Sequence, residues 1–219
     1  MMRIRITFAK QGALRYTGHL DLHKLWERAA RRAELPLAYS QGFHPQPKMN
    51  LAAALPLGFS SRCEVLDMKL EREIQLDGVR EKIQHTLPGG IQVSSVERAE
   101  EGAPALQTQV RSANYEITFI EADSRVDASE LKRRIDSVME SESIQRERRG
   151  KLYDLRPLIE ELTLAPSPLP MEEGQGVRVF MRLAAREGAT GRPEEVLDVL
   201  GIPFEETRIE RTRLIFQTE

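Results

Sequence analysis

Three histidines in the first 45 residues have the side chains that a metal site would need. His19 and His23 are four positions apart at the start of an expected helix, so both point to one face, and Asp21 lies between them. With His44 they would offer three ligands to zinc or iron. The pattern lacks the glutamate of a His-Glu-x-x-His motif. The alternative interpretation is structural, because His19 shares a helix face with Trp26, and we predict no metal site.

His19 and Asp21 are also the candidate catalytic residues, as an acid–base pair. The sequence has no Gly-x-Ser-x-Gly elbow, no phosphate-binding Gly-Lys-Ser/Thr loop and no Gly-x-Gly-x-x-Gly fingerprint. The single cysteine, Cys63, has no activating base that the sequence can place beside it, so we expect a packed thiol. These observations favour a non-catalytic protein and leave an enzyme as the alternative.

The segment from Tyr39 to Lys48 has the residue types that contact nucleic acid. Gly42 supplies unusual backbone angles and two prolines stiffen the chain. Phe43 and His44 add flat rings near the charge of Lys48, and unpaired bases stack on such rings. The alternative is a long hairpin loop in which Phe43 fills the core.

The net charge of −2 conceals a basic amino-terminal region. Residues 1–60 contain nine Lys and Arg against three acidic residues, so the rest of the chain is acidic. A basic region on a slightly acidic protein favours a polyanionic partner, although solvated charge on amphipathic elements gives a similar count. The candidate nucleic-acid contacts of this region, besides the two rings, are Arg15, Arg28, Arg31, Arg32 and Lys48.

A second basic cluster surrounds Gly150. On a strand, Arg146 and Arg148 would project from one face and could contact phosphates. Glu142 and Glu147 dilute this charge, so a solvated hairpin is the alternative.

Hydrophobic periodicity divides the chain into two similar series of elements. The first comprises a strand at 2–9, a helix at 19–33, extended segments at 35–40 and 49–55, a strand at 64–70, a helix at 77–87 and a strand at 91–97. The second comprises strands at 115–121, 143–149, 177–185 and 209–216 and helices at 128–139 and 193–200. Residues 151–164 are ambiguous, with Pro157 against an uninterrupted helix, and the prolines of 166–170 indicate a rigid connector.

Each series approximates β-α-β-β-α-β, the ferredoxin-like order, with an extra strand in the first. The sequence therefore predicts an α+β fold of two ferredoxin-like lobes, each an antiparallel sheet covered on one face by helices. We place the basic lobe at residues 1–100 and the second lobe at 113–219, with 98–112 as the linker.

The apolar runs, the first residues and the cysteine count of the sequence indicate the cellular compartment. No apolar run approaches the roughly 18 residues that a membrane helix needs, and Met1 to Ile6 alternates apolar and basic residues, unlike a signal peptide. One cysteine excludes an internal disulfide and any multi-cysteine metal site within the chain. We expect a cytoplasmic protein without membrane contact.

Several motifs together carry a family resemblance. They are Leu14-Arg15-Tyr16, His19-Leu20-Asp21, residues 28–33, residues 35–45, Pro56-Leu57-Gly58, Asp154-Leu155-Arg156-Pro157 and residues 192–197. With them the chain resembles, over nearly its whole length, the radical-SAM-linked protein family, an uncharacterised family found fused to, or encoded beside, radical-SAM proteins. The family's typical Ser-His-Leu-Asp is Gly18-His19-Leu20-Asp21 here, which removes the serine that would cap the helix. Asn is common in the family where His44 stands.

The resemblance implies a partner that carries an iron–sulfur cluster and S-adenosylmethionine. This chain has one cysteine where three are typical of that chemistry, so no cofactor is expected in it, and the resemblance implies a docking or substrate-recognition module. The preferred hypothesis is a non-catalytic adaptor that binds tRNA or ribosomal RNA and serves RNA modification, such as tRNA modification, with a radical-SAM partner. One alternative is an RNA-modifying enzyme similar in fold order to tRNA-type pseudouridine synthases, although their Arg-Thr-Asp context is missing here. The other is a pure protein–protein interaction module.

Overall fold

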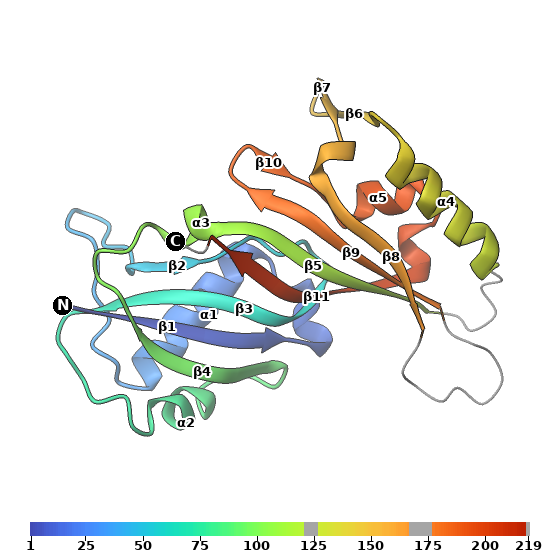
Figure 1. The fold of residues 1–219 in the computed structure, drawn as a ribbon. Coiled ribbons are helices and arrows are strands. Elements are labelled where there is room, and N and C mark those ends of the chain that lie inside the picture. Colours follow the sequence, from blue (N-terminus) through green and yellow to red (C-terminus); the bar gives the residue numbers. More distant parts are fainter. Residues whose placement is uncertain (121–126, 167–176, 218–219) are drawn as a thin grey trace. The chain divides into compact units, whose positions relative to one another are not determined.

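The chain divides into two compact units, which are described separately below (Figure 1). The structure is a computed structural model that describes residues 1–120, 127–166 and 177–217. The first unit is Met1–Val110 with the residues from Gln217 onward, and the second is Arg111–Phe216. The predicted linker 98–112 is not a plain loop, because its two ends belong to strands and Leu106 and Val110 are buried.

The first unit contains a four-stranded antiparallel sheet in the order β2-β3-β1-β4. Its elements are β1 Met2–Lys10, the 3-10 helix η1 Gly12–Tyr16, α1 His19–Arg32, β2 Met49–Leu51, β3 Ser60–Leu70, α2 Val79–Gln84, β4 Ile91–Ala99 and α3 Leu106–Gln109. The predicted extended segment 35–40 forms no strand. It is joined to its neighbours by the isolated bridges Leu37 to Leu70 and Tyr39 to Pro47 and by single backbone hydrogen bonds such as Ala38 N–H to Lys69 O.

The core of the first unit lies between one face of this sheet and the helices α1 and α2. Alternation along β1 turns Ile4, Ile6 and Phe8 to this face. The Phe8 ring meets the Trp26 ring of α1 edge-on, with centroids 4.7 Å apart. Val79 and Ile83 of α2 join the same cluster.

The other face of β1 and β3 holds a buried ion cluster. The Asp67 carboxylate, in β3, accepts hydrogen bonds from the Arg3 guanidinium at 2.6 and 3.0 Å and from the Arg5 guanidinium at 2.8 and 3.0 Å. Arg3 also donates to the carbonyl oxygens of Glu100, Ala103 and Pro104. The cluster therefore fixes the segment that follows β4 against the sheet.

The second unit also combines strands with helices. Its elements are β5 Val110–Phe119, α4 Ala128–Glu140, β6 Gln145–Arg148, β7 Lys151–Asp154, η2 Arg156–Leu158, β8 Ile159–Pro166, β9 Val177–Arg186, β10 Ala189–Thr190, α5 Pro193–Val199, η3 Phe204–Glu206 and β11 Thr207–Phe216. Strand β9 lies between β5 and β8, antiparallel to both, and β11 is the neighbour of β5. Leu131, Ile135 and Val138 bury one face of α4, and β6 and β7 form a separate hairpin.

The helices at 19–33, 77–87, 128–139 and 193–200 are confirmed as α1, α2, α4 and α5. The ambiguous residues 151–164 form β7, η2 and the start of β8. Pro157 lies in the short 3-10 helix η2, so no long helix crosses this segment, as expected from a proline in its middle. The predicted strand 143–149 is only the first arm of the β6–β7 hairpin. Beyond Pro166 the predicted connector 166–170 lies outside the described residues.

The fold class is thus mixed α and β, with predominantly antiparallel strand pairing and, in the described residues, five α-helices. None of these helices combines the length and apolar character that crossing a membrane requires.

Candidate nucleic-acid interface

The helix α1 positions a row of basic residues on the first unit. Its apolar residues Leu22, Trp26, Ala29 and Ala30 are buried, which turns the intervening polar residues outward. Gly18 at the N-cap makes no side-chain cap bond, consistent with the missing serine at this position. Acidic and basic residues stand at the appropriate ends of the helix dipole, with Asp21 in the first turn and Arg31 and Arg32 in the last.

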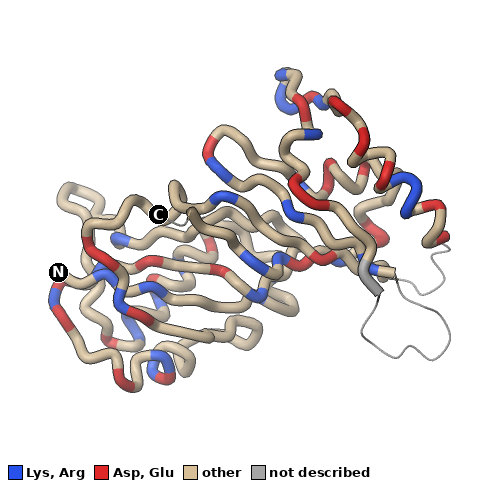
Figure 2. Tube along the Cα trace, viewed as in Figure 1, with Lys and Arg blue, Asp and Glu red and all other residues tan. Residues whose placement is uncertain are grey.

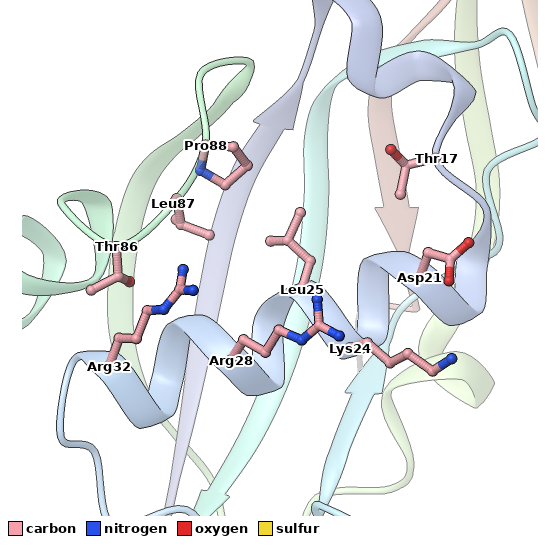
Figure 3. Close-up of a pocket in the computed structure, with 9 residues that line it drawn as sticks. All are labelled: Thr17, Asp21, Lys24, Leu25, Arg28, Arg32, Thr86, Leu87 and Pro88. Carbon is pink, nitrogen blue, oxygen red and sulfur yellow. The ribbon is translucent and has the colours of Figure 1, made fainter.

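A groove runs between α1 and the turn that follows α2. Lys24, Arg28 and Arg32 project at successive steps of four residues, so they form one row along the helix. The groove has a volume of about 640 Å³ (Figure 3), and its other lining residues are Thr17, Asp21, Leu25, Thr86, Leu87 and Pro88.

The wall opposite the helix is held by its own contacts. The Thr86 hydroxyl lies 3.1 Å from the carbonyl oxygen of Ala29, within hydrogen-bond distance of α1 itself. Gly90 follows with a φ of +97°, and an added Cβ there would lie 2.7 Å from the carbonyl oxygen of Gln11. The backbone N–H of Gln11 donates to the Gly90 carbonyl at 2.7 Å. The groove is therefore fixed by tight backbone packing.

The three cations of the row are free to bind an anion. Among the described residues none of Lys24, Arg28 and Arg32 has an ion-pair partner. Other basic residues of the unit are paired, as Arg80 is with Glu81 at 2.6 Å and Arg98 with Glu73 at 2.5 Å, whereas Arg31 and Arg72 are exposed without an ion pair in the described residues. Figure 2 shows basic and acidic residues interspersed along both units. The groove is distinguished because three cations without ion pairs in the described residues line it together.

The structure brings two of the predicted basic contacts, Arg28 and Arg32, into the groove and leaves three outside it. Arg15 stacks on the ring of Tyr16, with its guanidinium carbon 4.7 Å from the ring centroid. Arg31 is exposed, and Lys48 is half-buried at the base of a hairpin. The prediction missed Lys24 and the turn 86–88 as parts of the site. The signal for Lys24 was present, since it precedes Arg28 by four residues.

Phe43 and His44 stand at the tip of a hairpin, apart from the groove. The Phe43 side chain is fully exposed, so the alternative in which it fills the core is wrong. The arms are held by hydrogen bonds between Ser40 and Gln46, whose backbone N–H and O groups are 2.8 Å apart, and from Lys48 N–H to Ala38 O, also 2.8 Å. The Phe43 ring is therefore exposed to solvent at the tip of a hairpin whose arms are joined by hydrogen bonds.

The candidate metal ligands do not converge. His19 is exposed, His23 contacts the Met49 carbonyl oxygen at 3.3 Å through Nε2, and His44 lies at the hairpin tip. Within the part of the chain that the structure describes, no group of three or more His, Cys, Asp or Glu side chains is arranged to hold a metal ion. His19 and Trp26 both belong to α1, but Trp26 is buried while His19 is exposed at the start of the helix.

Cys63 is half-buried and forms no disulfide in the described residues. Its sulfur lies 3.7 Å from the Ser61 hydroxyl oxygen, and its backbone N–H donates to the same oxygen at 3.2 Å. These contacts agree with the packed thiol that we expected.

In the second unit, Arg146 and Arg148 are engaged by acidic residues of α5. Arg146 pairs with Asp198, and Arg148 pairs with Glu195 at 2.5 Å. The pKa of Arg148 is raised, first by the hydrogen bond to Glu195. The guanidinium of Arg148 also lies over the Tyr153 ring, 4.8 Å from its centroid. These contacts hold the β6–β7 hairpin to the helix, and a phosphate at this site would compete with two carboxylates.

Fold and site together define an α+β protein with a basic groove in its first unit. The model of the family described as "Uncharacterized protein conserved in bacteria (DUF2344)" matches residues 3–193, and the chain belongs to this family.

Solved structures include two weak likenesses. One is an unknown protein from Galdieria sulphuraria, with 15% identity, 99% of each chain covered and a TM-score of 0.27. The other is a protein described as a dyp-type peroxidase from Shewanella oneidensis, with 11% identity, 99% of this chain and 91% of that chain covered, and a TM-score of 0.23. At these scores neither likeness bears on fold or function. No curated protein matches the chain.

Proposed function

We propose that this protein is a non-catalytic, cytoplasmic accessory module of a radical-SAM protein and that its first unit binds RNA, either tRNA or ribosomal RNA. The observation that carries the proposal is the row of Lys24, Arg28 and Arg32, which has no ion-pair partners in the described residues. A row of free cations binds a phosphate backbone because bound counterions are released. The Thr86 hydroxyl and the apolar Leu87 beside the row add contacts that a sugar or base can use.

The strand order supports ferredoxin-like lobes as the scaffold. In the first unit, the order β1-α1-β2-β3-α2-β4 along the chain and the sheet order β2-β3-β1-β4 support the split β-α-β arrangement of that fold. In the second unit, β5, β8, β9 and β11 occupy the corresponding positions, with α4 and α5 as the two helices. This scaffold is used by many unrelated proteins, so the function is argued from the groove and not from the fold.

The radical-SAM partner is supported by the family resemblance and by the Phe43 hairpin. Residues 39–47 contain no Lys, Arg, Asp or Glu, and the Phe43 ring is fully exposed. Because the nearest predicted cation, Lys48, is half-buried at the base, this tip suits an apolar pocket of a protein better than a phosphate backbone. Phe43→Ala should abolish a nuclease-resistant complex with the radical-SAM protein. A complex that Phe43→Ala leaves intact would remove the hairpin from this role.

The test of RNA binding is the dependence of affinity on salt. Lys24→Gln/Arg28→Gln/Arg32→Gln should make the slope of log K against log[salt] less negative by about 2, since each phosphate contact to a single strand contributes about 0.7. The matched control is Arg72→Gln/Lys151→Gln/Arg213→Gln, which removes the same charge from exposed residues outside the groove. No binding by the unmodified protein at low salt, or an equal loss in both variants, would refute the proposal.

An RNA-modifying enzyme is the second candidate, and the observation that favours it is the place of Asp21 in the same groove. A carboxylate beside bound RNA could act as a general base. Asp21→Asn should then remove a modification from cellular RNA, whereas a pure binding role predicts an unchanged modification profile as long as the RNA remains bound.

A further inference from the structure

The groove of the first unit contains a free carboxylate, which a simple phosphate-binding surface would lack. Asp21 stands in the first turn of α1, at the end of the row formed by Lys24, Arg28 and Arg32. It is exposed, and no cation pairs with it among the described residues. Because a carboxylate repels phosphate and accepts hydrogen bonds, we expect the part of a nucleic acid that binds beside Asp21 to be a hydrogen-bond donor.

The two ends of the groove therefore differ in chemistry. Figure 3 shows the Arg32 guanidinium near Leu87 at one end of the groove and the Arg28 guanidinium beside Leu25 in its middle, while the Asp21 carboxylate lies near Thr17 at the other end. Leu25 is half-buried between them and offers an apolar floor. This polarity gives a bound strand a preferred position, with phosphates at one end and donors at the other.

We propose that the groove binds an unpaired RNA strand, with phosphates at Arg28 and Arg32 and a ribose 2′-hydroxyl donating to the Asp21 carboxylate. This inference rests on the proposed RNA binding and adds the form of RNA that is bound. The 2′-hydroxyl is a donor that DNA lacks, and it is the group by which proteins distinguish the two.

The size of the groove favours a single strand over a duplex. Its volume of about 640 Å³ is that of a site for a small ligand. From Lys24 to Arg32 the row extends about 12 Å along the helix. A module that reads double-stranded RNA contacts about 16 base pairs, a much longer surface.

The test compares three fluorescent probes by anisotropy: a 12-nucleotide single-stranded RNA, the DNA of the same sequence, and the RNA annealed to its complement. The unmodified protein should bind the single-stranded RNA about tenfold more tightly than either other probe. Asp21→Asn keeps an acceptor oxygen but loses the charge that strengthens the hydrogen bond, so it should lower the ratio of RNA to DNA affinity. Removing a negative charge strengthens the binding of every polyanion, so the ratio is the readout and not the affinity itself. Asp77→Asn, an exposed aspartate of the same unit outside the groove, should leave the ratio unchanged.

The outcomes separate this inference from the proposed function. If the duplex binds as tightly as the single strand, or if Asp21→Asn leaves the RNA to DNA ratio unchanged, the inference is overturned while RNA binding stands. If no probe binds at low salt, both are overturned. An unchanged emission spectrum of the buried Trp26 in Asp21→Asn verifies that the first unit remains folded.

Discussion

The carboxylate of Asp67 offers the most demanding test of how the first unit is held together. Asp67 is 2% exposed and accepts four hydrogen bonds from the guanidinium groups of Arg3 and Arg5. Asp67→Asn keeps the volume of the side chain and removes its charge. The Arg3 side chain, 6% exposed, would then be a buried cation without its carboxylate partner.

The two arginines contribute unequally to the expected loss. Removing one partner of a buried ion pair costs about 3–5 kcal/mol, because the other charge stays buried. The Arg5 side chain is 30% exposed, so water can hydrate its guanidinium once the carboxylate is removed. The loss of the Arg5 pair should therefore cost only as much as a surface ion pair, about 0–1 kcal/mol. We expect Asp67→Asn to lower the free energy of unfolding by about 4 kcal/mol, a large part of the roughly 5–15 kcal/mol typical of a folded protein.

Trp26 is the only tryptophan of the chain and is buried in the core of the first unit, so its fluorescence during urea denaturation reports this unit. Glu73→Gln is the matched control, because it breaks a pair with Arg98 in which both side chains are more than half exposed. It should cost less than about 1 kcal/mol. If Asp67→Asn costs no more than Glu73→Gln, the buried cluster does not stabilise the unit as argued.

Two further substitutions test other parts of the structure. Gly90→Ala should lower the stability of the first unit by about 1–3 kcal/mol in the same urea assay, because Gly90 has a positive φ and an added Cβ would contact backbone. Gly89→Ala is its control, with nothing within 4 Å of the added carbon, and equal effects of the two would contradict the reasoning. In the second unit, burial and then Glu195 raise the pKa of Tyr153 above its ordinary 10.0. Glu195→Gln should lower the pKa of Tyr153 in an absorbance titration of its phenolate, and an unchanged value would show that burial alone sets it.

Periodicity in the sequence was sufficient for the helices because each has an apolar stripe that must be buried. In α1, Leu22 and Trp26 recur at helical spacing, and the structure buries both. The errors fall where a single sequence lacks such a signal. Residues 35–40 contain buried apolar residues, but the segment pairs through isolated bridges instead of a continuous strand. Residues 98–112 are held in part by hydrogen bonds from the Arg3 guanidinium to backbone carbonyl oxygens of this segment. A contact between residues about 100 positions apart leaves no local pattern.

In the candidate site, too, local sequence patterns predict some features, whereas contacts between distant residues could not be predicted. The row along α1 could be predicted, since residues four apart share a helix face, but its opposite wall could not. Thr86 reaches the Ala29 carbonyl across 57 positions of sequence, and nothing near Thr86 indicates that contact. Likewise the sequence could not separate Arg28 from Arg148, because both are arginines within basic clusters. Only the structure shows that Arg148 is neutralised by Glu195 while Arg28 has no such partner in the described residues.

Partner availability therefore decides which basic residues of this chain can bind a polyanion. A phosphate that approaches Arg148 must displace Glu195 from a 2.5 Å ion pair and gains little. A phosphate that approaches Arg28 displaces only water and counterions, and their release favours binding. The excess positive charge of residues 1–60 therefore overestimates the charge available to a partner, because Arg3 and Arg5 of that region form ion pairs with Asp67. The row of Lys24, Arg28 and Arg32 keeps its charge available in the groove, and under our proposal the Asp21 carboxylate beside this row would let the groove select among polyanions.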